Sequence, residues 1–268
     1  MLRRLVSTIA VLGFSLVFSS LALAADLGGP TAPPLHAKAP PVVPFSWTGF
    51  YAGVHLGGGS SNTDWIDDGT PASLGGGVAG QRDASYHATG FLAGGQFGYN
   101  YQIGWAVLGA EADASWANLR GSMFNCFSQF AAFVAQSCST RTDALGSVTG
   151  RFGAAFDRSL LYVKGGFAWA HESYANPCMP IVAAVVCASA NATNTDTRIG
   201  WTIGAGFEYA LVRDWTVRVE YDFMDFGTRS ESFLLTPPVA AGVPPVLTEN
   251  IRDQIHVVKV GVNYRFGY

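Results

Sequence analysis

The sequence contains few charged residues. Only 13% of its 268 residues are charged, whereas a soluble domain carries about 25%, so an ordinary cytoplasmic enzyme fits poorly. It also lacks any run of lysine or arginine, and its formal net charge is -3, which removes the basic surface that nucleic-acid binding requires. An apolar content of 49% excludes a mainly disordered chain.

Beyond residue 46 the sequence lacks stretches of helical period and instead repeats the period-two alternation of β-strands. Eight strands are predicted, at 47–59, 88–102, 104–117, 142–156, 159–172, 197–210, 213–227 and 253–267. Three connections are tight, and the other four are long loops near 60–87, 118–141, 173–196 and 228–252. This rhythm predicts an all-β fold for residues 46–268, an eight-stranded antiparallel up-and-down transmembrane β-barrel.

The N-terminal residues are typical of an export signal. Arg3 and Arg4 precede an apolar stretch that closes with Ala22-Leu23-Ala24, so residues 1–24 are predicted to be a cleaved signal peptide, with a retained membrane anchor as the alternative. Residues 25–45 hold six prolines and almost no large apolar side chains, which indicates a periplasmic linker.

Charged residues inside the predicted strands fall on one face, together with glycines. Five acids and five bases share that face, so we expect an interior ion network, with apolar residues such as Val219 facing lipid. Alternation alone does not say which face points outward, and a soluble, lipocalin-like secreted barrel is the rival interpretation. The ten residues are Glu111, Asp113, Arg151, Lys164, Glu208, Arg218, Glu220, Asp222, Lys259 and Arg265.

Six of the seven tryptophans lie near predicted strand ends, which indicates two aromatic girdles. Two of these residues, Trp47 and Trp105, fall in the inward phase, which would require a bulge or a position outside the strand. The six are Trp47, Trp105 and Trp215 toward the tight turns and Trp116, Trp169 and Trp201 toward the long loops.

No catalytic, cofactor or metal site is predicted. His55, His87 and His256 lie near the long-loop rim, but His55 points inward and the other two outward, so a shared metal is not expected. The in-phase pair Glu111 and Asp113 fits the ion network more simply than acid/base catalysis.

There are only four cysteines, two in the second and two in the third long loop, and none lies in a predicted strand. Export favours their oxidation. Four cysteines allow three pairings. The barrel separates the strand ends from which different loops start, whereas the two cysteines within one loop can reach each other. The pairs Cys126–Cys138 and Cys178–Cys187 are therefore expected. A metal site is disfavoured because no C-x-x-C spacing occurs.

Several segments carry a family resemblance: Trp47-Thr48-Gly49-Phe50-Tyr51-Ala52-Gly53, Gly150-Arg151-Phe152-Gly153, Leu161 to Ala168 and the terminal aromatic strand. The chain resembles the small outer-membrane immunogenic proteins of alphaproteobacteria, also described as porin-family or opacity-like surface antigens. The resemblance implies a Gram-negative outer-membrane location. It also implies assembly by the outer-membrane machinery through the C-terminal signal Tyr264, Phe266 and Tyr268, where phenylalanine is the usual last residue.

The function expected is a non-enzymatic outer-membrane barrel with an envelope-structural and surface-interaction role, similar to an antigen or adhesin. Expected partners are outer-membrane lipid and lipopolysaccharide, the assembly machinery, and a surface partner contacted by the long loops. A narrow porin-like channel is the first alternative, although an eight-stranded barrel has an interior only wide enough for side chains. The second alternative is a soluble lipocalin-like ligand-binding barrel.

Overall fold

The computed structural model describes residues 45–69, 79–124, 134–176, 178–180, 192–234 and 246–266. The predicted signal peptide and all of the predicted linker except Phe45 lie outside these residues. The described part of the chain forms strands β1 (Gly49–Asp67), β2 (Arg82–Ile103), β3 (Ala106–Phe124), β4 (Val134–Phe156), β5 (Ser159–Asn176), β6 (Cys178–Pro180), β7 (Ala192–Ala210), β8 (Trp215–Leu234) and β9 (Val246–Phe266).

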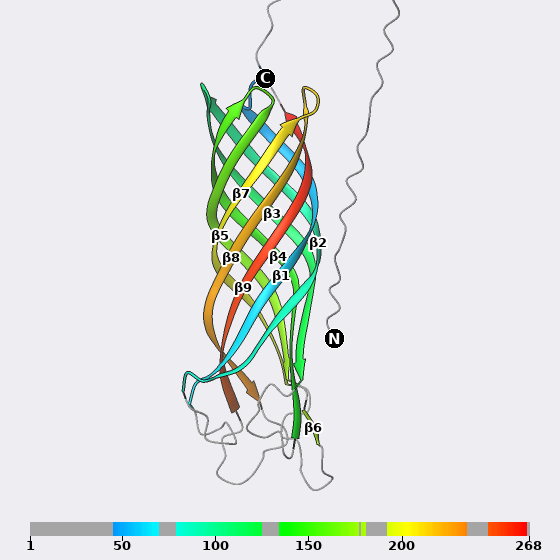
Figure 1. Ribbon diagram of the computed structural model, residues 1–268, viewed down its shortest axis with the longest axis vertical. Coiled ribbons are helices and arrows are strands. Elements are labelled where there is room, and N and C mark those ends of the chain that lie inside the picture. Colours follow the sequence, from blue (N-terminus) through cyan, green and yellow to red (C-terminus); the bar gives the residue numbers. More distant parts are fainter. Residues whose placement is uncertain are drawn as a thin grey trace, which may run out of the picture. The chain divides into compact units, whose positions relative to one another are not determined.

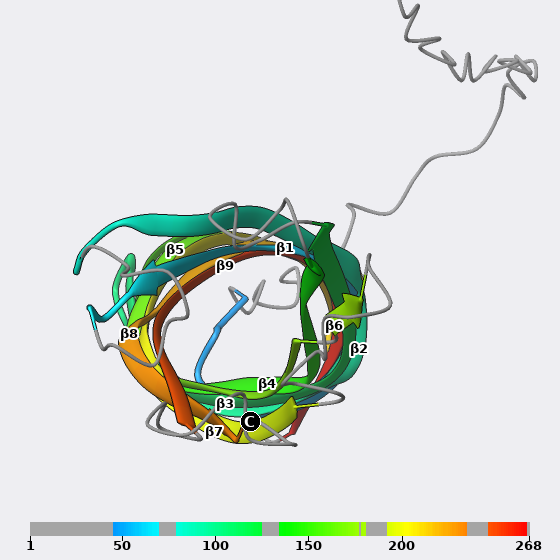
Figure 2. The same cartoon turned by 90° about the horizontal axis from the view of Figure 1, so that it is seen from below.

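Eight of these strands form a closed antiparallel barrel. Their order is β3-β2-β1-β9-β8-β7-β5-β4, and pairing of β3 with β4 closes the ring; the closed ring is visible in Figures 1 and 2. The three-residue strand β6 pairs only with the outer end of β4. Where the ring is closed, no strand edge is free, so the backbone groups there are satisfied without water. The predicted fold class is confirmed.

The alternating pattern places apolar side chains outside and polar ones inside. Val219 is 52% exposed on the outer face, whereas its neighbours Arg218 and Glu220 are buried in the lumen. The outward apolar zone is bounded by Trp105 and Trp215 near the tight turns and by Trp116 and Trp201 toward the loops; we call it the apolar belt. An outer face of this kind is suited to lipid, so the lipocalin-like alternative is wrong.

The strands run far beyond the belt. β2 has 22 residues and β4 has 23, whereas about 9 to 11 suffice to cross a membrane. The predicted loop boundaries are corrected accordingly: β1 continues to Asp67 and β2 starts at Arg82. In this outer extension both faces are mainly polar, so hydropathy carries no period that could reveal the strands.

The prediction that all four cysteines lie in loops is also wrong. Cys138 lies in β4 and Cys178 begins β6, because the outer extension of the barrel reaches into the segments that were predicted to be loops.

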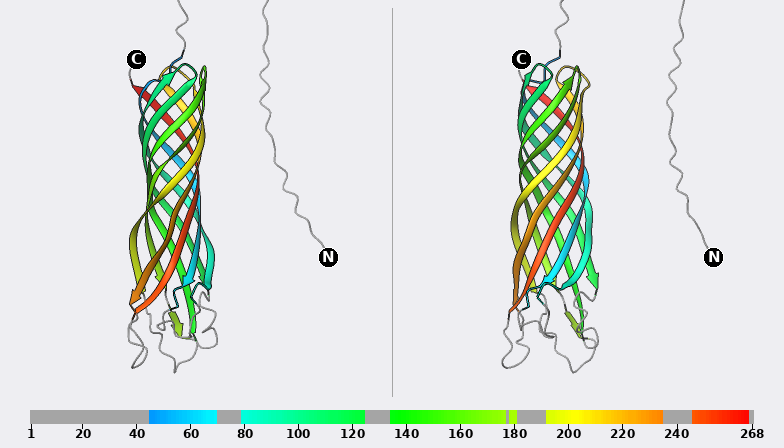
Figure 3. Two further views of the ribbon diagram at one scale, coloured as in Figure 1. Left: turned by 90° about the vertical axis from the view of Figure 1, so that its left-hand side faces the viewer. Right: turned by 60° about the vertical axis from the view of Figure 1, so that its left-hand side comes forward.

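The outer extension divides into two sheets. Pairing between β2 and β3 ends at Thr89 and Arg120, and pairing between β7 and β8 ends at Trp201 and Asp225. The remaining ladders continue outward, leaving the four-stranded sheets β8-β9-β1-β2 and β3-β4-β5-β7. Figure 3 shows the strands spreading apart toward the loop end.

The girdle assignment is wrong for Trp47. Its side chain is fully buried in the lumen at the tight-turn end, because the chain enters the barrel before β1 begins. Its backbone N–H donates to Gln102 Oε1 at 2.7 Å. Phe45 packs beside it, with Val107, Leu160 and other apolar residues completing a basal plug. Trp105 needs no bulge, since it lies in the exposed turn between β2 and β3.

Candidate functional site

The lumen above the basal plug is filled by ion pairs. Arg151 on β4 reaches Glu111 on β3 at 3.3 Å and Glu208 on β7 at 3.0 Å. Its guanidinium group lies 3.9 Å from the ring centroid of Tyr162. Arg218 contacts the same Glu111 at 2.5 Å. The contact of Arg218 with Glu111 joins β8 to β3, which lie on opposite sides of the barrel.

Two lysines extend this arrangement toward the loops. Lys164 lies 2.7 Å from Glu220 and 3.3 Å from Asp222. Lys259 approaches Asp222 at 2.7 Å, Glu220 at 3.0 Å and Asp113 at 3.4 Å. All these side chains are essentially inaccessible to solvent. Removing one partner would leave a buried charge uncompensated, so the pairs hold one another in place.

Nine of the ten sequence-predicted charged residues therefore lie together, and we call them the inner network. The tenth, Arg265, also points inward but lies lower, where it donates to the carbonyl of Ser46. Its guanidinium group stacks over Phe45 at 4.6 Å. Arg265 thus holds the basal plug.

An apolar layer covers the inner network on the loop side. It draws buried side chains from several strands around the ring, so it crosses the lumen. Its members are Leu92, Ala117, Leu119, Leu145, Ala168, Ala170, Met224, Phe226, Ile255 and Val257.

A second polar group, the outer cluster, lies beyond the belt and was not predicted from the sequence. It consists of Glu172, Tyr174, Arg198 and Asp253, all fully or almost fully buried. Tyr174 Oη lies 2.7 Å from Asp253 and also contacts Glu172. Arg198 pairs with Asp253 and donates to the carbonyl of Ile251 at 2.6 Å.

The outer cluster had a signal in the sequence. Glu172, Arg198 and Asp253 share the inward phase of the inner network. Glu172 is the last residue of a predicted strand, Asp253 is the first, and Arg198 is the second. Their position at strand ends made them look like loop residues.

Burial is the largest influence on the titration of this cluster. Together with the neighbouring carboxylate of Asp253, it raises the pKa of Glu172 to about 8. Burial also raises the pKa of Asp253, against the lowering effect of Arg198. The single positive charge of Arg198 can compensate only one of the two buried carboxylates, so the other carboxyl group favours its neutral form.

The histidines are dispersed, as their phases predicted. His55 lies in the lumen between Gln96 and Ser115, at 2.6 Å from each. His87 and His256 lie on the outer face, next to Asn62 and Tyr221 respectively. In the described ranges, no three potential metal ligands form a group.

Of the cysteines, Cys138 is disulfide-bonded and buried. Cys126 and Cys187 lie outside the described residues, so the pairing stays a prediction. Tyr264 and Phe266 of the predicted assembly signal point outward at the end of β9. Tyr268 lies outside the described residues, so the signal stays a prediction. No helix in the described part of the chain has both the length and the apolarity to span a bilayer.

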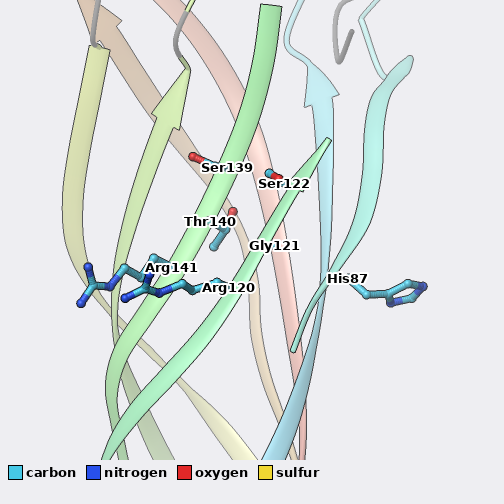
Figure 4. A pocket seen from close by; sticks show the side chains of 7 residues that line it. All are labelled: His87, Arg120, Gly121, Ser122, Ser139, Thr140 and Arg141. Atoms are coloured by element: carbon cyan, nitrogen blue, oxygen red, sulfur yellow. The ribbon is translucent and has the colours of Figure 1, made fainter. Parts of the chain in front are cut away.

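A groove marks the outer face where β2 and β3 separate. It has a volume of about 520 Å³ and is lined by Arg120, Gly121, Ser122, Ser139, Thr140, Arg141 and His87. We call it the arginine groove. Figure 4 shows the side chains of Arg120 and Arg141 extending to the same side of their strands, while His87 points the other way.

The chain is similar to several known outer-membrane proteins. The chain is 33% identical over 261 residues to the 31 kDa outer-membrane immunogenic protein of Brucella melitensis, covering 93% of this chain and 95% of that one. It is 26% identical to the 25 kDa outer-membrane immunogenic protein of Brucella abortus, covering 99% and 100%. Among solved structures it is similar to the outer membrane protease OmpT from Escherichia coli, with a TM-score of 0.45, 10% identity, and coverage of 84% and 99%.

A family model described as the outer membrane protein beta-barrel domain matches residues 34–266. With the outward apolar belt and the relatives named as outer-membrane proteins, this match locates the protein in the Gram-negative outer membrane. The chain belongs to the outer membrane protein beta-barrel family.

Proposed function

We propose that this protein is a non-enzymatic outer-membrane barrel that contributes to envelope structure and presents its outer extension and loops for surface interactions. The observation that carries this proposal is the filled lumen: basal plug, inner network, apolar layer and outer cluster succeed one another along the barrel. A packed barrel of eight strands acts as a rigid support and not as a wide pore.

The lack of a catalytic arrangement in the described residues supports a non-enzymatic role. The side chains that hydrogen-bond the outward histidines are Asn62 for His87, Thr197 for His171 and Tyr221 for His256. A general base needs an orienting partner and a nearby nucleophile, and none of these neutral partners provides a carboxylate. The carboxyl groups of the outer cluster are buried and out of reach of a substrate.

Each part of the outer surface suggests a partner. Outer-membrane lipid covers the apolar belt, and lipopolysaccharide surrounds the outer extension. The outer-membrane assembly machinery recognises the C-terminal strand β9. A surface partner contacts the loops, which a rigid barrel holds in place.

Conductance in a planar bilayer tests the proposal. The refolded full chain, with insertion verified by a gel comparison of boiled and unboiled samples, is expected to leave the bilayer electrically silent. Regular single-channel steps from the wild-type protein would instead establish the narrow-channel alternative, because current requires a continuous aqueous path through the lumen.

A further inference from the structure

Two arginines face each other across neighbouring strands in the arginine groove. Arg120 on β3 is directly opposite Arg141 on β4, and both side chains are exposed on the outer face. Like charges directly opposite one another in a sheet repel and destabilise the pair. This placement is therefore unfavourable unless an anion lies between or beside the two guanidinium groups.

The neighbourhood supplies only part of the compensating charge. Arg141 Nε contacts Asp143 at 2.5 Å, and Arg120 Nε donates to the neutral amide oxygen of Asn118 at 2.7 Å. Both contacts use Nε, and within the described residues the terminal nitrogens of the two guanidinium groups make no hydrogen bond. Two cations against one carboxylate leave a local excess of positive charge.

Other arginines beyond the belt are arranged differently. Three of them each have a carboxylate on the neighbouring strand: Arg229 with Asp196 at 2.8 Å, Arg82 with Asp64 at 3.5 Å, and Arg252 with Asp225 at 3.5 Å. The pair in the groove is thus distinct from the general surface of the outer extension.

The level of the groove indicates what could fill it. Arg120 is four residues beyond Trp116, which corresponds to about 9 Å along the barrel axis for a strand tilted by about 45°. Girdle tryptophans mark the headgroup level of the membrane, so the groove lies at the polar surface of the outer leaflet. A phosphate there is held at high local concentration by its own lipid.

We propose that the arginine groove binds a phosphate group of an outer-leaflet glycolipid. Guanidinium groups bind phosphate through paired, charge-assisted hydrogen bonds, and the terminal nitrogens of Arg120 and Arg141 supply several donors from opposite positions on two neighbouring strands. The inference rests on the outer-membrane role proposed above and names one lipid contact of that surface.

The test measures binding of fluorescent lipopolysaccharide to the purified full chain in neutral-detergent micelles. The double variant Arg120→Gln and Arg141→Gln is expected to bind about tenfold more weakly, as the loss of charge-assisted hydrogen bonds predicts. The matched control, Arg229→Gln with Arg252→Gln, removes the same charge beyond the belt and is expected to bind within about twofold of wild type. Arg120→Lys with Arg141→Lys keeps the charge but loses the planar fork, so an intermediate loss is expected.

Two further arms identify the source of the phosphate. Dephosphorylated lipopolysaccharide should bind wild type and the glutamine double variant equally, and millimolar inorganic phosphate should not compete with the intact lipid. Equal affinity of wild type and the double variant for intact lipopolysaccharide, or an equal loss in the control, would overturn the site. Competition by inorganic phosphate would assign the groove to a free ion instead.

Failure of this site and failure of the proposed function give different results. A barrel that is silent in the bilayer but binds lipopolysaccharide without Arg120 and Arg141 keeps the structural role and loses the site. A conducting barrel with an intact arginine dependence loses the structural role and keeps the site.

Discussion

Tyr174 shows how the buried polar groups of the outer extension depend on protonation. Its hydroxyl contacts both Glu172 and Asp253, but a hydroxyl has one proton to donate. The second contact is a hydrogen bond only if one of the two carboxyl groups is protonated and donates to the tyrosine oxygen. Because Arg198 pairs closely with Asp253 and lies 3.9 Å from Glu172, Glu172 is the better candidate for the proton.

This protonation predicts a pH-dependent stability. The pKa of Glu172 rises on folding from 4.5 to about 8, so the folded state retains a proton that the unfolded state releases. The stabilisation from this group is complete below its unfolded pKa and is lost as pH rises through about 8. Wild type should therefore lose stability relative to Glu172→Gln, which stays neutral, between about pH 5 and about pH 9.

Urea unfolding in detergent micelles at both pH values measures this difference. Asp64→Asn, at a carboxylate that is 25% exposed and paired with Arg82, is the matched control and should show no such trend against wild type. A constant difference between wild type and Glu172→Gln at both pH values would show that Glu172 is ionised throughout.

Val219 tests which face of the barrel contacts lipid. It lies on β8 in the middle of the apolar belt, where Val219→Arg should cost about 2 to 4 kcal/mol in folding free energy. Thr228→Arg, on the same strand but exposed beyond the belt, should be nearly neutral. Refolding yield and unfolding in lipid vesicles measure both variants, and equal stability of the two would mean that the belt does not contact hydrocarbon.

The strands also show how far sequence patterns can predict a barrel. Inside the belt, lipid and lumen impose opposite chemistry on alternating residues, so the period of two is readable and the inward charges could be identified. Beyond the belt both faces are mainly polar, and residues such as Asn62 and Thr63 look like a loop although they lie in β1. The outer cluster was missed for this reason, and Trp47 was misplaced because chain entry into the lumen has no periodic signal.

The C-terminal strand combines closure with the predicted assembly signal. β9 pairs with β1 as far as Phe266, which is opposite Phe50, so the end of β9 lies where the first and last strands of the barrel meet. We expect deletion of Tyr268, or Tyr268→Asp, to lower the amount of assembled protein in the outer membrane much more than Tyr268→Phe, because an aromatic ring is retained in the last variant. Heat-modifiable protein in isolated outer membranes is the measurement, and full assembly of the truncated chain would remove Tyr268 from the signal.

The whole molecule behaves as a closed barrel that continues into two facing sheets, and side chains replace the missing ladders between them. Arg198 on β7 reaches β9 through Asp253 and the carbonyl of Ile251. Tyr86 on β2 reaches Thr140 on β4 at 2.6 Å. At the other separation, Asn194 donates to Glu231 at 2.5 Å. Because these contacts carry the connection that backbone bonds provide elsewhere, the outer extension should open locally while the belt stays closed.

Asp253→Ala should reveal this division. The substitution leaves Arg198 buried without its closest partner, and breaking a buried pair in this way costs about 3 to 5 kcal/mol. The inner network and the apolar layer do not contain Asp253, so the loss should remain in the outer extension. Hydrogen exchange should increase in residues 60–67, 192–198 and 246–253 and stay slow between Trp105 and Trp116. Asp64→Ala, at a partly exposed carboxylate paired with the exposed Arg82, serves as the control and should leave both regions protected, since an ion pair in contact with solvent contributes little. Uniformly faster exchange along whole strands in Asp253→Ala would mean that the barrel and its extension unfold as one unit, and that the side-chain contacts between the two sheets do not form a separate cooperative element.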